Sequence, residues 1–243
     1  MTRLGIPQPI GIVTGLQVEA RLARRLSSLV ACTGGVHANV APAAERLLAS
    51  GAKSLMSFGI AGGLAPDLPP GTLIVANEVV TGGRRYPAAA ALLDASFPRN
   101  RESIVGHQAG GNTDSRFHGN DNRKIVVGLL YGDIRIASQP SDKKLIYETT
   151  GALAVDLESG EAARVAAAAG VPFIALRAIA DPAWRGLPEA ALLPLDSEGR
   201  PRLAAVFGSI MKKPGQIPGL IMTARDARAG LKALLRACSV LVV

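Results

Sequence analysis

The sequence predicts one α/β domain with three layers, in which helices cover both faces of a mixed central sheet. Short apolar runs alternate along the chain with helix-length amphipathic segments, as in proteins whose strands are joined by helices. A length of 243 residues suits one such domain, and 48% apolar residues can build a sizeable core. The stretch Gly151–Asp181 carries the third observation, because it contains strand, helix and strand patterns in succession.

The N-terminal third is expected to hold three strands and two helices. The predicted strands are the apolar runs Ile10–Thr14, Lys53–Phe58 and Thr72–Val80, and the predicted helices are Val18–Leu29 and Ala41–Ala49. Gly51 should close the second helix, because glycine adopts the left-handed conformation that follows many helices. Glu19 falls in the first turn of the first helix, where the helix dipole alone would favour a carboxylate.

A glycine-rich segment, Gly59-Ile60-Ala61-Gly62-Gly63, follows the second predicted strand. Its small residues would let a ligand approach the backbone closely, although a purely structural turn explains them as well. The segment is not a GxGxxG sequence, and the chain has no GxxxxGK[ST] motif. Dinucleotide-binding and P-loop functions are therefore set aside.

The segment 97–122 differs from the rest, since it is rich in Arg, Gly, Asn and Asp and lacks a sustained period. Such a composition buries little apolar area, so we expect an exposed insertion that is poorly ordered or loosely packed. His107 and His118 lie in it without metal-ligand spacing, and no metal site is expected. The sheet pattern resumes in Lys124–Leu130 and Asp133–Ala137.

The stretch Gly151–Asp181 is the most informative part of the chain. A strand over Ala152–Val155 is followed by an alanine-rich helix that stops at Gly170, and a second strand covers Val171–Ile179. Such a crossover joins parallel strands, whose carboxyl ends share one edge of the sheet. Glu158 and Asp181 each follow a strand, so the pattern predicts two carboxylates facing one ligand crevice.

The C-terminal section, about 203–237, is predicted to be helical and basic. Helices are expected over Leu203–Met211 and Ile221–Leu235, and from Gly199 onward eight Lys and Arg residues face one acid, Asp226. This excess of positive charge would favour binding of phosphate, anionic lipid or nucleic acid, although a helix face exposed to solvent would also explain it. Nucleic-acid binding is not expected, because aromatic residues are few and no recognition motif is present.

Cysteine content and hydropathy predict a soluble cytoplasmic protein. Cys32 and Cys238 form neither a CxxC pair nor a disulfide framework, as is usual in a reducing compartment. The N-terminus lacks an apolar segment of secretory length, and the longest apolar run, Val165–Leu176, is too short to span a bilayer.

Three stretches resemble the nucleoside phosphorylase and methylthioadenosine/adenosylhomocysteine nucleosidase superfamily. They are GIVTGLQVEA, FGIAGGLAPDLPPGTLIVANEVV and AVDLESGEAARVAAAAGVPFIALRAIAD, and the third is the most specific. Within the superfamily, ADPAWRGLPEAAL and the later KKPGQIPGL resemble the hopanoid-associated phosphorylases. That branch is taken to release adenine from adenosylhopane, a lipid-linked nucleoside.

The resemblance implies roles for individual residues. Asp181 would protonate N7 of the leaving purine, Glu158 would bind the ribose hydroxyls, and Glu19 would orient the attacking water. Arg177 would support the site. The other substrate-binding positions that the resemblance implies are Leu157, Gly59, Ala61, Gly62 and Ser138. It also implies a homo-oligomer, for which we expect a dimer, and no cofactor apart from phosphate as a co-substrate.

Three departures from the family pattern leave alternatives open. Leu157 replaces the usual Met, Ala180 replaces a Ser beside the acid, and Ile60 replaces a Ser or Thr of the glycine-rich segment. Phosphate sites in the superfamily use hydroxyls of that segment, and Ile60 has none. The sequence therefore leaves open whether water or phosphate accepts the ribosyl group. The alternatives are a methylthioadenosine/adenosylhomocysteine-type nucleosidase, or a catalytically degenerate binding or peripheral membrane protein at the inner face of the membrane.

Overall fold

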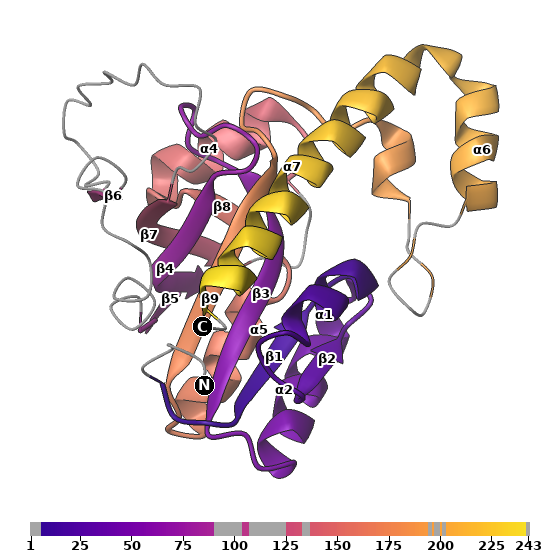
Figure 1. The fold of residues 1–243 in the computed structure, drawn as a ribbon. Helices are drawn as coiled ribbons and strands as arrows, with labels where there is room; N and C mark the ends of the chain where they lie inside the picture. The colour runs from indigo at the N-terminus through magenta and orange to yellow at the C-terminus, as the bar shows by residue number, and fades with distance from the viewer. Residues whose placement is uncertain are drawn as a thin grey trace.

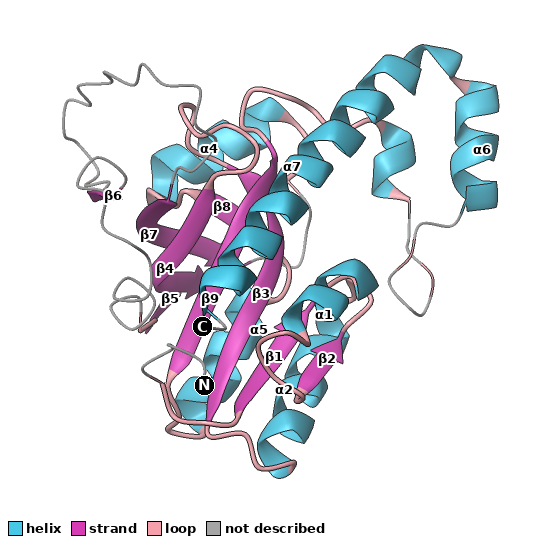
Figure 2. Cartoon of the chain, in the orientation of Figure 1, coloured by secondary structure: helices cyan, strands magenta, loops and turns pink. Residues whose placement is uncertain are grey.

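A computed structural model describes residues 6–89, 104–106, 125–132, 137–193, 196, 200 and 203–241. Its central mixed sheet lies among helices, as Figures 1 and 2 show. The strands are β1 (Ile10–Thr14), β2 (Val30–Cys32), β3 (Ser54–Gly63), β4 (Leu73–Thr81), β5 (Arg84–Pro87), β6 (Ile104–Gly106), β7 (Ile125–Gly132), β8 (Ala154–Asp156) and β9 (Phe173–Asp181). The α-helices are α1 (Gln17–Ala23), α2 (Val40–Ala49), α4 (Pro140–Thr150), α5 (Ser159–Ala168), α6 (Leu203–Lys212) and α7 (Ile217–Leu241).

The sheet curls so that part of it closes on itself. The strand order is β2-β1-β3-β8-β7-β4-β5, and β9 pairs with both β3 and β4. Strands β3, β8, β7, β4 and β9 therefore form a ring of neighbours. Within it, β3 pairs antiparallel with β8 and parallel with β9, while β4 pairs antiparallel with β9. The mixed three-layer α/β architecture predicted from the sequence is confirmed. The sequence also led us to expect parallel strands that end together at one open edge of the sheet, and this expectation is wrong because the strands form a ring.

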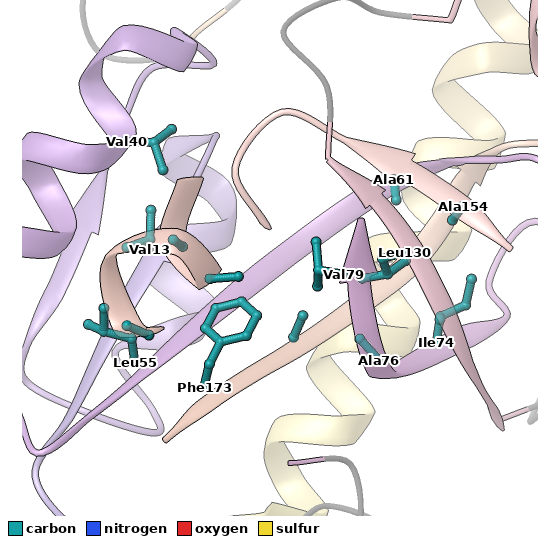
Figure 3. Packing of buried hydrophobic residues seen from close by; sticks show 14 of the residues in the cluster. Val13, Val40, Leu55, Ala61, Ile74, Ala76, Val79, Leu130, Ala154 and Phe173 are labelled. Carbon is teal, nitrogen blue, oxygen red and sulfur yellow. The ribbon is translucent and has the colours of Figure 1, made fainter. Parts of the chain in front are cut away.

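Side-chain alternation along the strands supplies two cores, one on each face of the sheet. Val13, Leu55 and Ile74 point to the face that α2 and α5 cover, and Figure 3 shows part of this packing. Their neighbours Ile12, Met56 and Val75 belong to the cluster on the other face, with residues of α1 and α7. A strand that is buried on both faces has a continuous run of apolar residues in its sequence. This explains why most of the strands could be predicted from the sequence.

Several predicted boundaries are confirmed, others differ by a few residues, as for the last helix, which spans Ile217–Leu241 instead of Ile221–Leu235, and two errors are larger. Helix α5 ends before Gly170, whose φ is 65°, and α2 before Gly51, whose φ is 97°. The first helix ends at Ala23 instead of continuing to Leu29. Ser27 explains the early stop, because its hydroxyl donates to the carbonyl of Ile10 in β1 at 2.6 Å and accepts from the Leu29 amide. The chain can then enter β2, a strand that the sequence did not predict.

The second error concerns the glycine-rich segment, which is the end of strand β3 and not a turn. Glycine at this point does not end the strand because the ladder to β9 continues through it, from Gly59 opposite Arg177 to Ala61 opposite Ile179.

The predicted insertion 97–122 is described only at Ile104–Gly106, the strand β6, which pairs in parallel with β7. The rest of the insertion, with both of its histidines, lies outside the described residues, as do 133–136 of the following predicted strand. At the C-terminal end, α7 lies against β9, whereas its first turns and α6 project away from the sheet (Figure 1). Among the described residues, no helix is both long and apolar enough to cross a bilayer.

Candidate active site

Strands β8 and β9 bring Glu158 and Asp181 to strand β3, but not in the way predicted. The parallel crossover is wrong, since β8 is antiparallel to β3 and β9 is parallel to it. The two strands therefore run in opposite directions and meet at β3. Val155 of β8 and Asp181 of β9 both lie opposite Gly62. The predicted site residues Glu158 and Asp181 are consequently arranged along the last residues of β3 and not along a shared edge of parallel strands.

Glu19 is a buried carboxylate held by backbone amides from two elements. Its Oε2 accepts hydrogen bonds from the amides of Gly15 and Leu16 at 3.0 and 2.8 Å, and its Oε1 accepts from the amide of Ile60 at 2.8 Å. The side chain thus links the start of α1 to strand β3. Burial raises the pKa of Glu19, although Arg177 and the three amides act in the opposite direction. A carboxylate has about four acceptor positions, so one is left for a further donor.

Arg177 is fully buried in β9 and organises the polar residues around it. Its Nη2 donates to Ser57 Oγ at 2.5 Å, to Asp156 Oδ1 at 2.9 Å and to Glu158 Oε2 at 3.1 Å. Its Nε donates to Ser159 Oγ at 3.3 Å. Strands β3, β8 and β9 and the start of α5 are tied together by one guanidinium.

Glu158 lies between this arginine and the end of β1. A side chain on Gly15 would meet its Oε1 at 2.5 Å, so only glycine leaves room for the carboxylate there. The pKa of Glu158 is raised to about 7, chiefly by burial; Arg177 acts to lower it, and the nearby carboxylates Asp156 and Glu19 act with burial to raise it. Its own position is held by Asp156, whose Oδ1 accepts from the Glu158 amide at 2.8 Å.

Asp181 reaches its position through an irregularity in β9. The register shifts between Ala61 and Gly62, so that Ile179 lies opposite Ala61 and Asp181 lies opposite Gly62, with Ala180 as the extra residue. Regular alternation would place Asp181 on the face of Arg177 and Ile179, and the bulge turns it onto the face of Gly62. A side chain on Gly62 would lie 3.6 Å from Asp181 Oδ2.

Lys143 of α4 is the principal site residue that the sequence did not reveal. Its Nζ donates to Asp181 Oδ2 at 2.6 Å and to the carbonyls of Pro182 and Arg185 at 2.9 Å each, and the side chain is fully buried. Ala180 lacks the hydroxyl that the resemblance leads us to expect beside Asp181, and Lys143 holds the Asp181 side chain instead. Helical spacing was the available signal, because Lys143 shares a face with the partly buried Ile146 and Tyr147.

The glycines of β3 do not all leave space for a ligand beside the backbone, as the sequence had suggested. A Cβ at Gly59 would lie 2.6 Å from Glu19 Oε1 and 2.7 Å from Arg177 Nη1, so protein side chains occupy the space expected for a ligand. Ala61 is buried beside Ile179 in the ladder. Gly62 lies against the Asp181 carboxylate, and a side chain on the next residue, Gly63, would meet the Asp181 carbonyl oxygen at 3.3 Å.

The two remaining predicted positions lie in loops near these side chains. Leu157 is half-buried between Asp156 and Glu158. Ser138 precedes α4, and its carbonyl accepts from the Leu187 amide at 2.9 Å. The loop before α4 therefore lies against the segment that follows Asp181. In the part of the chain that the structure describes, no group of three or more His, Cys, Asp and Glu has the arrangement of a metal site.

Comparison with protein families gives a match to the phosphorylase superfamily over residues 22–211. Among curated proteins, the 5'-methylthioadenosine/S-adenosylhomocysteine nucleosidase of Mycobacterium bovis is 24% identical over 218 residues, which cover 72% of this chain and 82% of that protein.

Solved structures show the same fold at low sequence identity. A nucleosidase mutant from Helicobacter pylori with 5'-methylthioadenosine in its active site superposes with a TM-score of 0.58 and 14% identity, covering 96% of this chain and 99% of the other. The futalosine hydrolase of Helicobacter pylori gives a TM-score of 0.59 and 16% identity, covering 95% and 96%.

Proposed function

The chain belongs to the phosphorylase superfamily and is an enzyme of the nucleosidase and phosphorylase class, and from this membership we propose that it hydrolyses the N-ribosidic bond of a 5'-substituted adenosine. The observation that carries the proposal is the group of carboxylates along β3. Glu19 lies against Gly59, Glu158 pairs with Arg177 opposite Gly59, and Asp181 lies opposite Gly62, about 10 Å further along the strand.

Asp181 is the proposed general acid. A purine anion is a poor leaving group, so a proton delivered to N7 assists departure of the base, and a positioned acid contributes about 10²–10⁴-fold. Burial raises the pKa of Asp181, although the hydrogen bond from Lys143 opposes this effect. A raised pKa keeps more of this carboxyl protonated near neutral pH.

Glu158 and Glu19 are proposed to act on the sugar side. Loss of the base leaves an oxocarbenium-like ribose, which nearby negative charge stabilises. Glu158 would accept hydrogen bonds from the 2' and 3' hydroxyls, with its orientation set by Arg177. Glu19 would use its remaining acceptor position to hold the attacking water and take its proton. Leu157, beside Glu158, and Ser138, in the loop before α4, would contact the substrate.

The charge of this cluster favours water over phosphate as the acceptor. Three carboxyl side chains, Glu19, Asp156 and Glu158, surround the single guanidinium of Arg177. Two of them form ion pairs with it, at 2.9 and 3.1 Å, so its charge is already compensated. A phosphate dianion entering this environment would be repelled, whereas neutral water would not.

We propose adenosylhopane as the substrate because of the C-terminal resemblance described above. The curated relative is a methylthioadenosine/adenosylhomocysteine nucleosidase, so its substrates are the alternative. Purified protein should be incubated with adenosylhopane in detergent, 5'-methylthioadenosine, S-adenosylhomocysteine and adenosine, each with and without phosphate. We expect adenine and free ribose products at rates independent of phosphate. Formation of a ribose 1-phosphate would contradict hydrolysis, and no adenine from any of the four would contradict the proposed activity.

A second proposal concerns the α6–α7 hairpin, defined as residues 203–228, which we expect to contact an anionic membrane. Its exposed apolar side chains are Phe207, Met211, Ile217, Ile221 and Met222, and its exposed basic ones are Lys212, Lys213, Arg225 and Arg228. Apolar groups beside basic groups on a projecting helical element suit the interface of an anionic bilayer. Such contact would place the enzyme at the inner, cytoplasmic face, where a lipid-linked substrate could be reached.

Flotation with vesicles tests this second proposal. We expect binding to phosphatidylserine vesicles, none to neutral phosphatidylcholine vesicles, and loss of binding when Lys212, Lys213, Arg225 and Arg228 are changed to Gln. Changing exposed Lys53, which lies before β3, to Gln is the control. The resemblance also implies a homo-oligomer, for which we expect a dimer, and ultracentrifugation would show whether the hairpin is a subunit interface instead. Dimers that dissociate when Phe207 and Met211 are changed to Ser would contradict membrane contact.

A further inference from the structure

Lys143 is a buried ammonium that uses each of its donors behind the proposed acid. One hydrogen bond goes to Asp181 Oδ2 and the other two go to the carbonyls of Pro182 and Arg185, all within 2.9 Å. A buried lysine is retained only when its charge and its N–H groups are satisfied. Asp181 is the only carboxylate that the described structure pairs with it.

The same three contacts also satisfy the pair after a proton has moved. A neutral lysine has two N–H donors and one lone pair. The donors can remain on the carbonyls of Pro182 and Arg185, and the lone pair can accept from a protonated Asp181. Either distribution of the proton leaves every polar atom of the lysine partnered. One proton can therefore reside either on Lys143 Nζ or on Asp181 Oδ2, which lie 2.6 Å apart.

We propose that Lys143 is a positioning residue and proton source for Asp181, passing the proton that Asp181 delivers to the leaving base. The inference rests on the proposed function. In the step, the Nζ–H bond of Lys143 breaks as an O–H bond forms on Asp181, and Asp181 gives a proton to N7. The pair of electrons in the C1'–N9 bond leaves with the base, which departs neutral. Water adds to C1' and loses a proton to Glu19. Glu19 then releases that proton to solvent, and Lys143 takes one from solvent, so that both groups return to their starting states.

The surroundings bring the two groups toward equal proton affinity. Burial lowers the pKa of Lys143 and raises the pKa of Asp181, so the two titrate as a pair. Among the residues that the structure describes, the other charged groups that act on the pair are Arg185, in the segment after β9, and Asp226 of α7, which form an ion pair with each other. Neither replaces Lys143 as the hydrogen-bond partner of Asp181.

The test removes the transferable proton of residue 143 while keeping its positive charge. Arginine carries a positive charge but does not lose its proton in proteins, so K143R retains the cation and removes the proton source. K143M removes both. The control is K144R at the neighbouring exposed lysine, whose nearest acid is Glu148 at 3.7 Å. The readout is kcat/KM for adenine release between about pH 5 and pH 9, with circular dichroism to establish folding.

In the wild type we expect activity to persist to the pH at which the pair loses its shared proton. In K143R and K143M the alkaline limb should move to lower pH by about one unit or more, which is about tenfold in kcat/KM at high pH. K144R should follow the wild type. K143R alone decides the matter where K143M does not fold.

Two results would overturn the inference while the proposed function stands. One is an alkaline limb in K143R that matches the wild type with uniformly lower activity, as a structural role predicts. The other is a limb that moves upward in K143M and not in K143R, as a purely electrostatic role predicts. A wild type that releases no adenine would overturn the proposed function and this inference with it.

Discussion

The guanidinium of Arg177 lies 3.1 Å from the Oε2 atom of Glu158, and neither side chain is more than 7% exposed. This contact joins the second residue after β8 to the middle of β9, across strand β3. Because a buried charge is costly without its partner, each side chain depends on the other for its place in the fold. The proposed ribose-binding residue is therefore positioned by the core and not by a loop.

Removing this arginine should destabilise the protein strongly. R177M leaves Asp156 and Glu158 buried without their cation, and we expect a loss of about 3–5 kcal/mol in the free energy of unfolding. R164M is the matched control, because Arg164 forms an exposed pair with Glu161 at 2.7 Å, worth less than about 1 kcal/mol. Urea denaturation measures both, and equal losses would contradict the central place of Arg177.

Glu158 should make stability fall as pH rises. Its pKa is about 7 in the folded protein, against an ordinary 4.5, so between these values the folded state binds more protons than the unfolded state. The free energy of unfolding should therefore decrease through this range, by on the order of 1–3 kcal/mol. E158Q should flatten this dependence. Denaturation midpoints at about pH 5 and pH 7.5 measure the effect, and an unchanged slope in E158Q would exclude Glu158 as its cause.

D181N should abolish most catalysis while the fold is kept. Asparagine preserves the shape of the side chain and cannot deliver a proton, so we expect adenine release to fall by at least about 10²-fold. D142N, at an exposed acid in the first turn of α4, should stay near wild-type activity. Circular dichroism would establish that both variants fold, and an active D181N would remove Asp181 from the role of acid.

G59A should disturb the site from within. The added methyl would lie 2.6 Å from Glu19 Oε1 and 2.7 Å from Arg177 Nη1, and both side chains would have to move. We expect a loss of stability of about 1–3 kcal/mol together with a loss of activity. G208A is the control, since that position in α6 has open space and alanine favours the helix. Similar behaviour of the two variants would contradict the close packing at Gly59.

Local patterns in the sequence predicted the fold class and most elements. Apolar runs such as Ile10–Thr14 were located because a strand buried on both faces has a continuous apolar signature. Gly51 and Gly170 marked helix ends because their backbone conformation is one that other residues avoid. These signals lie within a few residues of one another along the chain. The roles assigned to Asp181, Glu158 and Glu19 came from the resemblance and stay proposals.

What the sequence could not determine was which strands are neighbours and in which direction they run. β8 and β9 look like a parallel crossover locally, yet both meet β3 in opposite directions, because pairing is decided by the whole ring of strands. For the same reason Lys143 resembled its exposed neighbour Lys144 until the fold placed it behind Asp181.

The sequence by itself determined part of the candidate site, namely two carboxylates, Glu158 and Asp181, that follow strands, and a glycine-rich segment after a third strand. Tertiary structure alone decided that Arg177 neutralises Asp156 and Glu158 and that a bulge at Ala180 turns Asp181 toward Lys143. Burial, charge pairing and strand register arise only when distant segments pack together, and these interactions decide which side chains meet.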